Sequence, residues 1–222
     1  MNLSEILFER TKDIWNVSAS KPFVTEMAKG TLDDSLFRRY MVQDYLYLQE
    51  YISILKQLRS TSSNSEITDF LDKIIEETVR ESERVHLPNM ERLGITGGEL
   101  DKCNELPVIS EYVAFMRKCV NEQGHLGGLT SLLQCSWVYA YISDVSFKEY
   151  PEEIAVSKYK SWFDSYSCQS YLDANQMWID LVDKESTGID ENGVEIMCRI
   201  FEGCALYENQ LWDALYDTII LC

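Results

Sequence analysis

Apolar residues recur along most of the chain at intervals of three and four positions, the spacing that places them on one face of an α-helix. A long seam of this kind occupies Phe37, Met41, Leu48, Tyr51, Leu55 and Leu58. No stretch shows clearly the alternation of apolar and polar residues that indicates a β-strand. Helices are therefore expected at about residues 3–18, 24–29, 33–60, 66–93, 108–121, 129–145, 151–166, 169–184 and 191–220.

Proline and glycine interrupt this pattern at a few places. The interruptions are Pro22 and the glycine-containing segments at residues 30–33, 94–107 and 123–128. We expect these segments to be connections between neighbouring helices. The predicted helix at residues 129–145 is apolar on nearly every side, so it should lie in the interior. Without repeats or linkers, residues 1–222 are expected to form one all-α domain, a helical bundle.

The charge balance restricts the partners. The chain of 222 residues has 37 acidic and 20 basic side chains, a net charge of −17. Such a surface repels phosphate backbones and anionic lipids, so nucleic acid and membrane surfaces are not expected partners. Polar residues interrupt the most apolar stretch, at residues 126–142, which therefore does not predict a membrane span. The N-terminus lacks the apolar core of a signal peptide, and the seven scattered cysteines contain no CxxC pair. The cysteine pattern favours free thiols in a reducing compartment, and together the two features favour a cytoplasmic location.

Two carboxylates occupy positions where the helical pattern calls for apolar residues. Asp44 lies on the seam of the helix at 33–60, and Glu208 continues a seam that includes Phe201 and Cys204. Burial of an unpaired carboxylate is costly, so each should have a structural partner, a buried Arg, Tyr or Trp, or a role in a site. Burial also raises the pKa of a carboxyl group towards the range that a general acid needs. Two such acids in one bundle favour a site.

Aromatic residues accompany both acids. Tyr47 follows Asp44 by one helical turn, while Tyr207 adjoins Glu208 and Trp212 lies one turn further on. Most aromatic stripes belong to the core. Aromatic rings beside buried acids also suit a flat, hydrogen-bonding and cationic ligand ring.

Cys135 lies in the middle of the apolar helix at 129–145. Cysteine is often buried as a small hydrophobic residue, and that is one interpretation of this position. The other is a nucleophile, which needs a base or a positively charged group nearby.

A metal centre is not expected. Glu83 and His86 match the Glu-x-x-His pattern of di-iron bundles, but such a site needs two pairs. The only other histidine, His125, lies in a glycine-containing segment without that pattern. A structural role is therefore expected for His86.

At the level of longer motifs, the sequence resembles the thiaminase II (TenA-like) family over nearly its whole length. The most specific motif is Gln43-Asp44-Tyr45-Leu46-Tyr47-Leu48, with the form Gln-Asp-x-x-Tyr-Leu. Further matching segments, in the family's order, are Lys21–Val24, Gly30–Leu32, Phe37–Val42, Cys135–Tyr139, Trp162–Tyr166, and Tyr207-Glu208 with Trp212.

The resemblance implies a heme-oxygenase-like helical bundle that assembles as a homotetramer and needs no cofactor. It implies hydrolysis of an aminopyrimidine of the 4-amino-5-aminomethyl-2-methylpyrimidine type to hydroxymethylpyrimidine in thiamine salvage, with cleavage of thiamine by some members.

The resemblance also implies residue roles. Asp44 would bind the ring nitrogen and amino group of the pyrimidine, Cys135 would attack the ring, and Glu208 would transfer protons. The tyrosines that would line the pocket are Tyr47, Tyr112, Tyr139 and Tyr166. Asp44, Glu208 and Cys135 are thus predicted to face one pocket from three helices.

The chain departs from the family pattern at three places. Gln134 replaces a common Pro, Tyr141-Ile142-Ser143 a common Glu-Ile-Gly, and Leu211 a common Phe. These departures leave the choice between thiamine and its degradation products open. Two other functions stay open at this point, a metal- or cofactor-dependent oxygenase on the same scaffold and a pyrimidine-binding homologue without activity.

Overall fold

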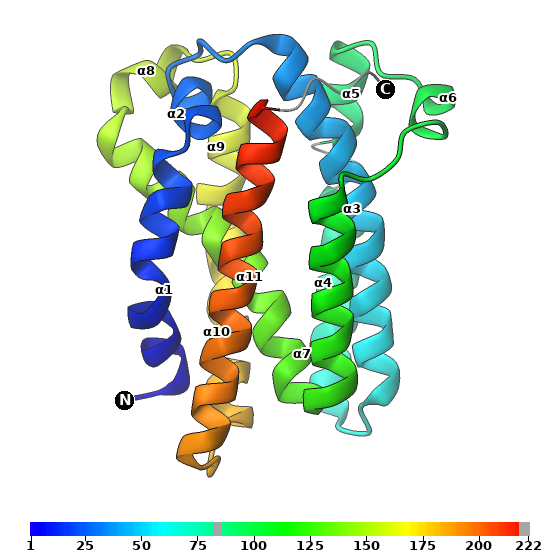
Figure 1. The fold of residues 1–222 in the computed structure, drawn as a ribbon, viewed down its shortest axis with the longest axis vertical. Helices are drawn as coiled ribbons and strands as arrows, with labels where there is room; N and C mark the ends of the chain where they lie inside the picture. Colours follow the sequence, from blue (N-terminus) through cyan, green and yellow to red (C-terminus); the bar gives the residue numbers. More distant parts are fainter. Residues whose placement is uncertain (82–85, 218–222) are drawn as a thin grey trace.

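The described part of the chain, residues 1–81 and 86–217 of a computed structural model, folds into helices and contains no strand (Figure 1). The helices are α1 (Leu3–Ser20), α2 (Pro22–Ala28), α3 (Asp34–Thr61), α4 (Ser65–Glu81), α5 (Leu87–Arg92), α6 (Gly97–Leu100), α7 (Pro107–Glu149), α8 (Pro151–Val156), α9 (Lys160–Ser167), α10 (Gln169–Glu185) and α11 (Glu191–Asp217). The all-α class predicted from the periodicity is confirmed. Residues 82–85, inside the helix expected at 66–93, and residues 218–220, the end of the helix expected at 191–220, lie outside the described residues.

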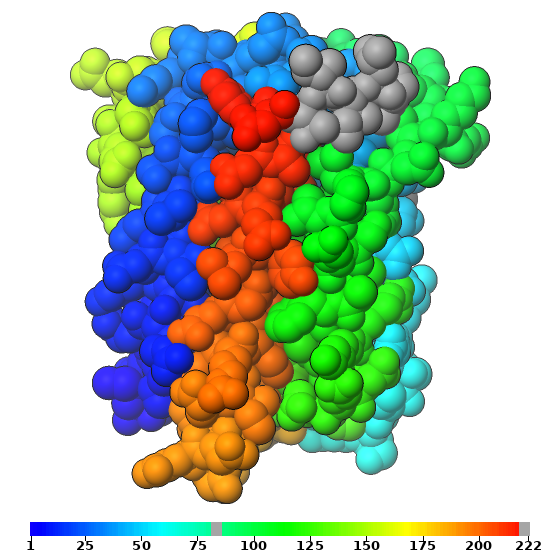
Figure 2. Space-filling model, viewed as in Figure 1, coloured from blue at the N-terminus to red at the C-terminus, as the bar shows by residue number. Residues whose placement is uncertain are grey.

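Helix α7 forms the centre of the bundle. It packs against α1, α3, α9, α10 and α11, and α11 in turn packs against α1. On the face shown in Figure 2, α11 forms a ridge between α1 and the first half of α7. The second half of α7 is buried along most of its length, as the all-round apolar sequence at 129–145 predicts.

The expected connection at residues 123–128 is much shorter than predicted, because the two helical segments of α7 meet at a kink within it. Gly124 alone leaves helical geometry, with φ 63° and ψ −152°, and it kinks the helix there. Glycine adopts a positive φ without a steric penalty, so one residue absorbs the change of direction.

Gly128 has a different role, because a Cβ there would lie 2.8 Å from Leu58 Cδ1. Its missing side chain lets α7 approach α3 closely.

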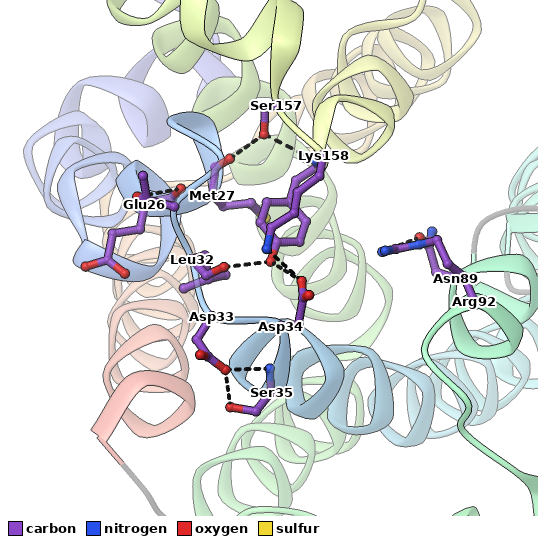
Figure 3. A network of polar contacts seen from close by, with 12 residues as sticks. Glu26, Met27, Leu32, Asp33, Asp34, Ser35, Asn89, Arg92, Ser157 and Lys158 are labelled. Atoms are coloured by element: carbon purple, nitrogen blue, oxygen red, sulfur yellow. Dashed lines mark hydrogen bonds and ion pairs between the residues drawn. The ribbon is translucent and has the colours of Figure 1, made fainter.

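The single helix expected at residues 151–166 is wrong. Ser157 has extended backbone angles and separates α8 from α9. Its hydroxyl donates a hydrogen bond to the carbonyl oxygen of Met27 at 2.9 Å and accepts one from the amide of Tyr159 at 3.1 Å (Figure 3). These two bonds of the Ser157 side chain replace the backbone hydrogen bonding that would continue α8 as a helix.

The same end of the bundle contains the start of α3. Asp33 caps this helix by accepting a hydrogen bond from the amide of Ser35 at 2.8 Å (Figure 3). Asp34 binds Lys158 at 2.8 Å and accepts a hydrogen bond from the Tyr159 hydroxyl at 3.0 Å. The beginning of α3, which carries Asp44 further along, is thereby fixed to the connection between α8 and α9.

No helix in the described ranges combines the length and apolar character needed to cross a membrane. The six cysteines that the structure describes are free, and Cys222 lies outside the described residues.

Candidate active site

A cavity of about 450 Å³ opens between α3, α4, α7, α9 and α10. Its lining is mainly aromatic and apolar, with a few acidic, hydroxyl and thiol groups. The described residues that line it are Asp44, Tyr47, Leu48, Tyr51, Ile74, Glu77, Thr78, Arg80, Cys135, Ser136, Tyr139, Ser165, Tyr166, Cys168, Ser170, Tyr171, Ala174 and Trp178. Such a lining suits a small, largely apolar ligand that is oriented by a few polar groups.

Asp44 reaches this cavity from α3 and is 8% exposed. Its Oδ2 atom accepts a hydrogen bond from Nε2 of the buried His86 at 2.5 Å. The partner of Asp44 is thus a histidine, where the sequence suggested an Arg, Tyr or Trp. Because His86 binds one oxygen of the carboxylate, the other oxygen is the one left to meet a ligand in the cavity.

Cys135 reaches the same cavity from α7 and is also 8% exposed. The Tyr47 hydroxyl donates a hydrogen bond to its sulfur at 3.0 Å. Burial raises the pKa of the Cys135 thiol well above its usual value, and the negative charge of Glu208 adds to that effect. The hydrogen bond from Tyr47 acts in the opposite direction. Cys135 is therefore a neutral thiol near pH 7, and it needs a base before it can attack.

Glu208 on α11 is the candidate for that base. It is only 1% exposed and does not belong to the cavity lining, but its carboxyl group interacts by hydrogen bonding with Tyr112 and Cys135. Burial raises its pKa to about 8, and hydrogen bonds donated to its ionised form by Tyr112 or Cys135 act against that rise. Its Oε2 atom has no hydrogen-bond partner within the described ranges. Glu208 is thus buried beside the thiol without being one of the lining residues, and its access to a ligand in the cavity stays a prediction.

Three of the four predicted tyrosines line the cavity, namely Tyr47, Tyr139 and Tyr166. The rings of Tyr139 and Tyr166 lie 4.9 Å apart. Tyr112 is not among the lining residues, so its predicted place in the pocket stays a prediction. Its ring stacks on the ring of Tyr47 at 5.8 Å, and Tyr47 occupies the cavity wall. Tyr112 therefore lies next to the cavity wall, and it also interacts with Glu208.

Several lining residues were not predicted. Tyr51 donates a hydrogen bond to the Leu132 carbonyl at 3.2 Å, and Trp178 donates one to the Leu129 carbonyl at 3.0 Å. Both bonds fix aromatic side chains of the cavity wall to the backbone of α7. Helical periodicity places such residues on an inner face but does not reveal which cavity they border. His86 was expected to have a structural role, and its contact with the cavity residue Asp44 was not predicted.

The acidic and thiol groups of this region are of the types that bind metal ions in proteins. No group of three or more His, Cys, Asp or Glu side chains in the described ranges is arranged to hold a metal ion. Glu83, from the Glu-x-x-His pattern, lies outside those ranges, and His86 binds Asp44.

Comparisons with known proteins agree with this fold. An aminopyrimidine aminohydrolase of Halalkalibacterium halodurans is 25% identical over 217 residues, which span 98% of this chain and 96% of that protein. An aminopyrimidine aminohydrolase of Helicobacter pylori is 24% identical, spanning 98% of this chain and 100% of that protein. A solved TenA homologue from P. horikoshii OT3 has a TM-score of 0.87 at 22% identity, covering 97% of this chain and 99% of its own, which confirms the TenA-like bundle. A model of the TENA/THI-4/PQQC family matches residues 8–218, and the chain therefore belongs to this family.

Proposed function

We propose that the protein hydrolyses an aminopyrimidine of the 4-amino-5-aminomethyl-2-methylpyrimidine type to the hydroxymethylpyrimidine, with Cys135 as nucleophile and Glu208 as proton carrier. The observation that carries the proposal is the arrangement of three groups from three helices. Asp44 and Cys135 line one cavity, and Glu208 interacts with the thiol of Cys135. The two relatives named aminopyrimidine aminohydrolase support the same chemistry.

Asp44 has the binding role in this proposal. A 4-aminopyrimidine presents an amino group and a neighbouring ring nitrogen, and a carboxylate accepts hydrogen bonds from both when the nitrogen is protonated. His86 holds Oδ2 of Asp44 and so orients the carboxylate towards the cavity. The wall rings of Tyr139 and Tyr166 offer flat faces for the pyrimidine. Binding through Asp44 also withdraws electrons from the ring and prepares it for attack.

The first half of the reaction joins sulfur to the ring. The ionised Glu208 takes the proton of the Cys135 thiol, and the sulfur forms a bond to the ring carbon beside the one that bears the aminomethyl group. The displaced electron pair breaks the bond between the methylene carbon and the amine. Glu208 returns its proton to the departing nitrogen, which leaves as ammonia.

The second half restores the enzyme. Water adds to the methylene carbon and gives a proton to Glu208, which forms the hydroxymethyl group. The bond between carbon and sulfur then breaks, and the sulfur takes the proton back from Glu208. The sum is amine plus water to alcohol plus ammonia, so one carboxyl group serves every proton transfer.

A product assay tests this function directly. Purified protein is incubated with a panel that contains the aminomethylpyrimidine, related aminopyrimidines and thiamine, and the hydroxymethyl product and released amine are measured together. Equal amounts of both products are expected for at least one substrate, and Glu208→Gln is expected to lower the rate by about 100-fold or more. Tight binding of the panel without any product would replace the proposal with a binding protein that lacks activity.

The homotetramer and the cytoplasmic location expected from the sequence stay predictions. Light scattering of the purified protein tests the first, and fractionation of its native cells tests the second.

A further inference from the structure

Gln134 precedes Cys135 on α7 and is fully buried. Its Oε1 atom accepts a hydrogen bond from the Tyr112 hydroxyl at 3.0 Å. Its Nε2 atom has no hydrogen-bond partner among the residues that the structure describes. A buried amide with an unpartnered nitrogen is costly, so the hydrogen bond of its oxygen needs an explanation beyond packing.

The Tyr112 hydroxyl has three hydrogen-bonding neighbours. It donates to Gln134 at 3.0 Å, and it also interacts with Glu208 and with the Cys204 thiol. A phenol carries a single proton and can donate it to only one of them at a time. Burial raises the pKa of Tyr112 well above its usual value, so the phenol keeps that proton across the neutral range.

The ring of Tyr112 cannot turn to serve these neighbours in another way. It is stacked between Tyr47 at 5.8 Å and Tyr207 at 5.3 Å, with interplanar angles of 20° and 12°. Only rotation of the hydroxyl hydrogen redirects the bond. The direction of this one hydrogen therefore decides the role of the phenol towards Glu208. The phenol either donates a hydrogen bond to the carboxylate or can only accept one from the protonated carboxyl group.

We propose that Gln134 is a positioning residue that holds the Tyr112 hydroxyl bond away from Glu208 and so makes Glu208 the stronger base towards the Cys135 thiol. With the phenol turned to Gln134, the phenolic oxygen accepts a hydrogen bond from the protonated Glu208 but gives none to the ionised form. The arrangement favours the proton on Glu208. The catalytic consequence rests on the proton-carrier role proposed for Glu208, whereas the hydrogen-bond competition does not.

Other ionisable groups act on Glu208 as well, and they must stay constant in a test. Within the described ranges they are Asp44 and Tyr47 from α3, Tyr112, Cys135 and Tyr139 from α7, and Cys204 from α11. A substitution of Gln134 removes none of these ionisable side chains.

Gln134→Met is the informative substitution. Methionine has a similar shape, its thioether is a much weaker acceptor for the Tyr112 bond than an amide oxygen, and it places no unpartnered nitrogen in the core, so the fold should persist. The released hydroxyl turns to Glu208 and stabilises its ionised form. The titration midpoint of Glu208 should then fall by about one pH unit relative to the wild type.

The midpoint is measured on the full-length protein without any substrate. Infrared difference spectra follow the carbonyl stretch of the protonated carboxyl group through a pH titration, and subtraction of the Glu208→Gln spectrum assigns the band. This readout works even if the protein hydrolyses no aminopyrimidine, so failure of the proposed reaction and failure of this inference are distinguishable. If the reaction holds, the acid limb of kcat/KM should move to lower pH by the same amount.

A second background provides the matched control. In Tyr112→Phe the competing hydroxyl is absent, so adding Gln134→Met should leave the midpoint where Tyr112→Phe alone puts it. Gln134→Leu, with circular dichroism as the check on folding, repeats the test with a different apolar side chain. The inference is overturned by an unchanged midpoint in Gln134→Met, by a rise, which would mean that the amide donates to the phenol, or by an equal fall in the Tyr112→Phe background.

Discussion

The imidazole of His86 and the carboxylate of Asp44 meet at 2.5 Å although 42 positions separate the two residues along the chain. Both are buried, and Asp44 borders the cavity. A histidine that donates to one carboxylate oxygen fixes the direction in which the other oxygen points. The pair therefore links His86, which directly precedes α5, to the part of α3 that lines the cavity.

His86→Met should weaken pyrimidine binding by about tenfold, because Asp44 loses the donor that orients it. His86→Gln keeps a donor and should recover part of the affinity. Calorimetric titration with the hydroxymethylpyrimidine product measures the effect. His125→Gln is the matched control, because this second histidine bonds to Thr61 at 3.2 Å and does not line the cavity. Equal affinity of His86→Met and the wild type would remove His86 from the binding site.

Asp44→Asn should weaken binding of the same ligand by about 1.5–3 kcal/mol. The amide accepts one hydrogen bond but presents a donor where the pyrimidine amidine also donates. Asp69→Asn, at an exposed position on α4, should leave the affinity unchanged. An Asp44→Asn protein that binds the product as tightly as the wild type would contradict the binding role.

Glu208 should make folding stability depend on pH. Its pKa is raised from 4.5 to about 8 by burial, so between these values the folded state binds more protons than the unfolded state. Stability from this group is then fully present below about pH 4.5 and falls as the pH rises towards 8. The total change is about 5 kcal/mol at most.

Urea denaturation of the wild type and of Glu208→Gln at several pH values isolates this contribution, because their other groups cancel. The wild type should lose stability relative to Glu208→Gln as the pH rises through that window. Glu111→Gln, an exposed site on α7, should show no such divergence. Parallel stability curves for the wild type and Glu208→Gln would show that the pKa of this carboxyl group is not raised.

Periodicity was sufficient for the main helices and for the burial of the two acids. Asp44 and Glu208 lie on apolar seams, and both are buried as those seams predict. The contact between Asp44 and His86 could not be predicted in this way, because it depends on how distant segments pack. The contact between Glu208 and the Cys135 thiol could not be predicted for the same reason. An apolar seam shows which face of a helix is buried, but it does not show which residues that face contacts.

Packing between distant segments explains two of the differences between the expected and observed helices. Glycine clusters usually indicate loops, yet at residues 123–128 only Gly124 leaves helical geometry and Gly128 serves close packing. Ser157 ends α8 because its hydroxyl bonds to the Met27 carbonyl, a contact with α2 that is invisible in the local sequence. Both features require the tertiary structure.

Gly128→Ala should destabilise the protein by about 1–3 kcal/mol despite the better helix propensity of alanine. The added Cβ would lie 2.8 Å from Leu58 Cδ1 and 3.1 Å from Val120 Cγ2 in the packed contact between α7 and α3. Gly98→Ala is the control, because a Cβ at that position meets nothing within 4 Å. Urea midpoints measure both, and equal midpoints for the two variants would show that the close approach at Gly128 is unimportant.

Cys135→Ser should abolish hydrolysis while leaving the fold and product binding nearly intact. Serine is close in size, so packing around position 135 is maintained, and the Tyr47 hydroxyl at 3.0 Å from the sulfur can still bond to an oxygen there. A serine hydroxyl has a much higher pKa than a thiol, however, and is a far weaker nucleophile. The expected signature is turnover at background level with an unchanged dissociation constant for the hydroxymethylpyrimidine.

The other cysteines provide the internal control for this prediction. Cys119 and Cys198 are buried elsewhere in the bundle, and the same substitution at either should leave turnover near the wild-type rate. Cys168 is unsuitable as a control, because it lines the cavity with Cys135. Mass spectrometry of the protein during turnover adds a direct readout, since a pyrimidine adduct should form on the wild type and be absent from Cys135→Ser. Wild-type turnover by Cys135→Ser on every substrate of the parent protein would exclude the thiol as nucleophile and leave Glu208 to activate water without it.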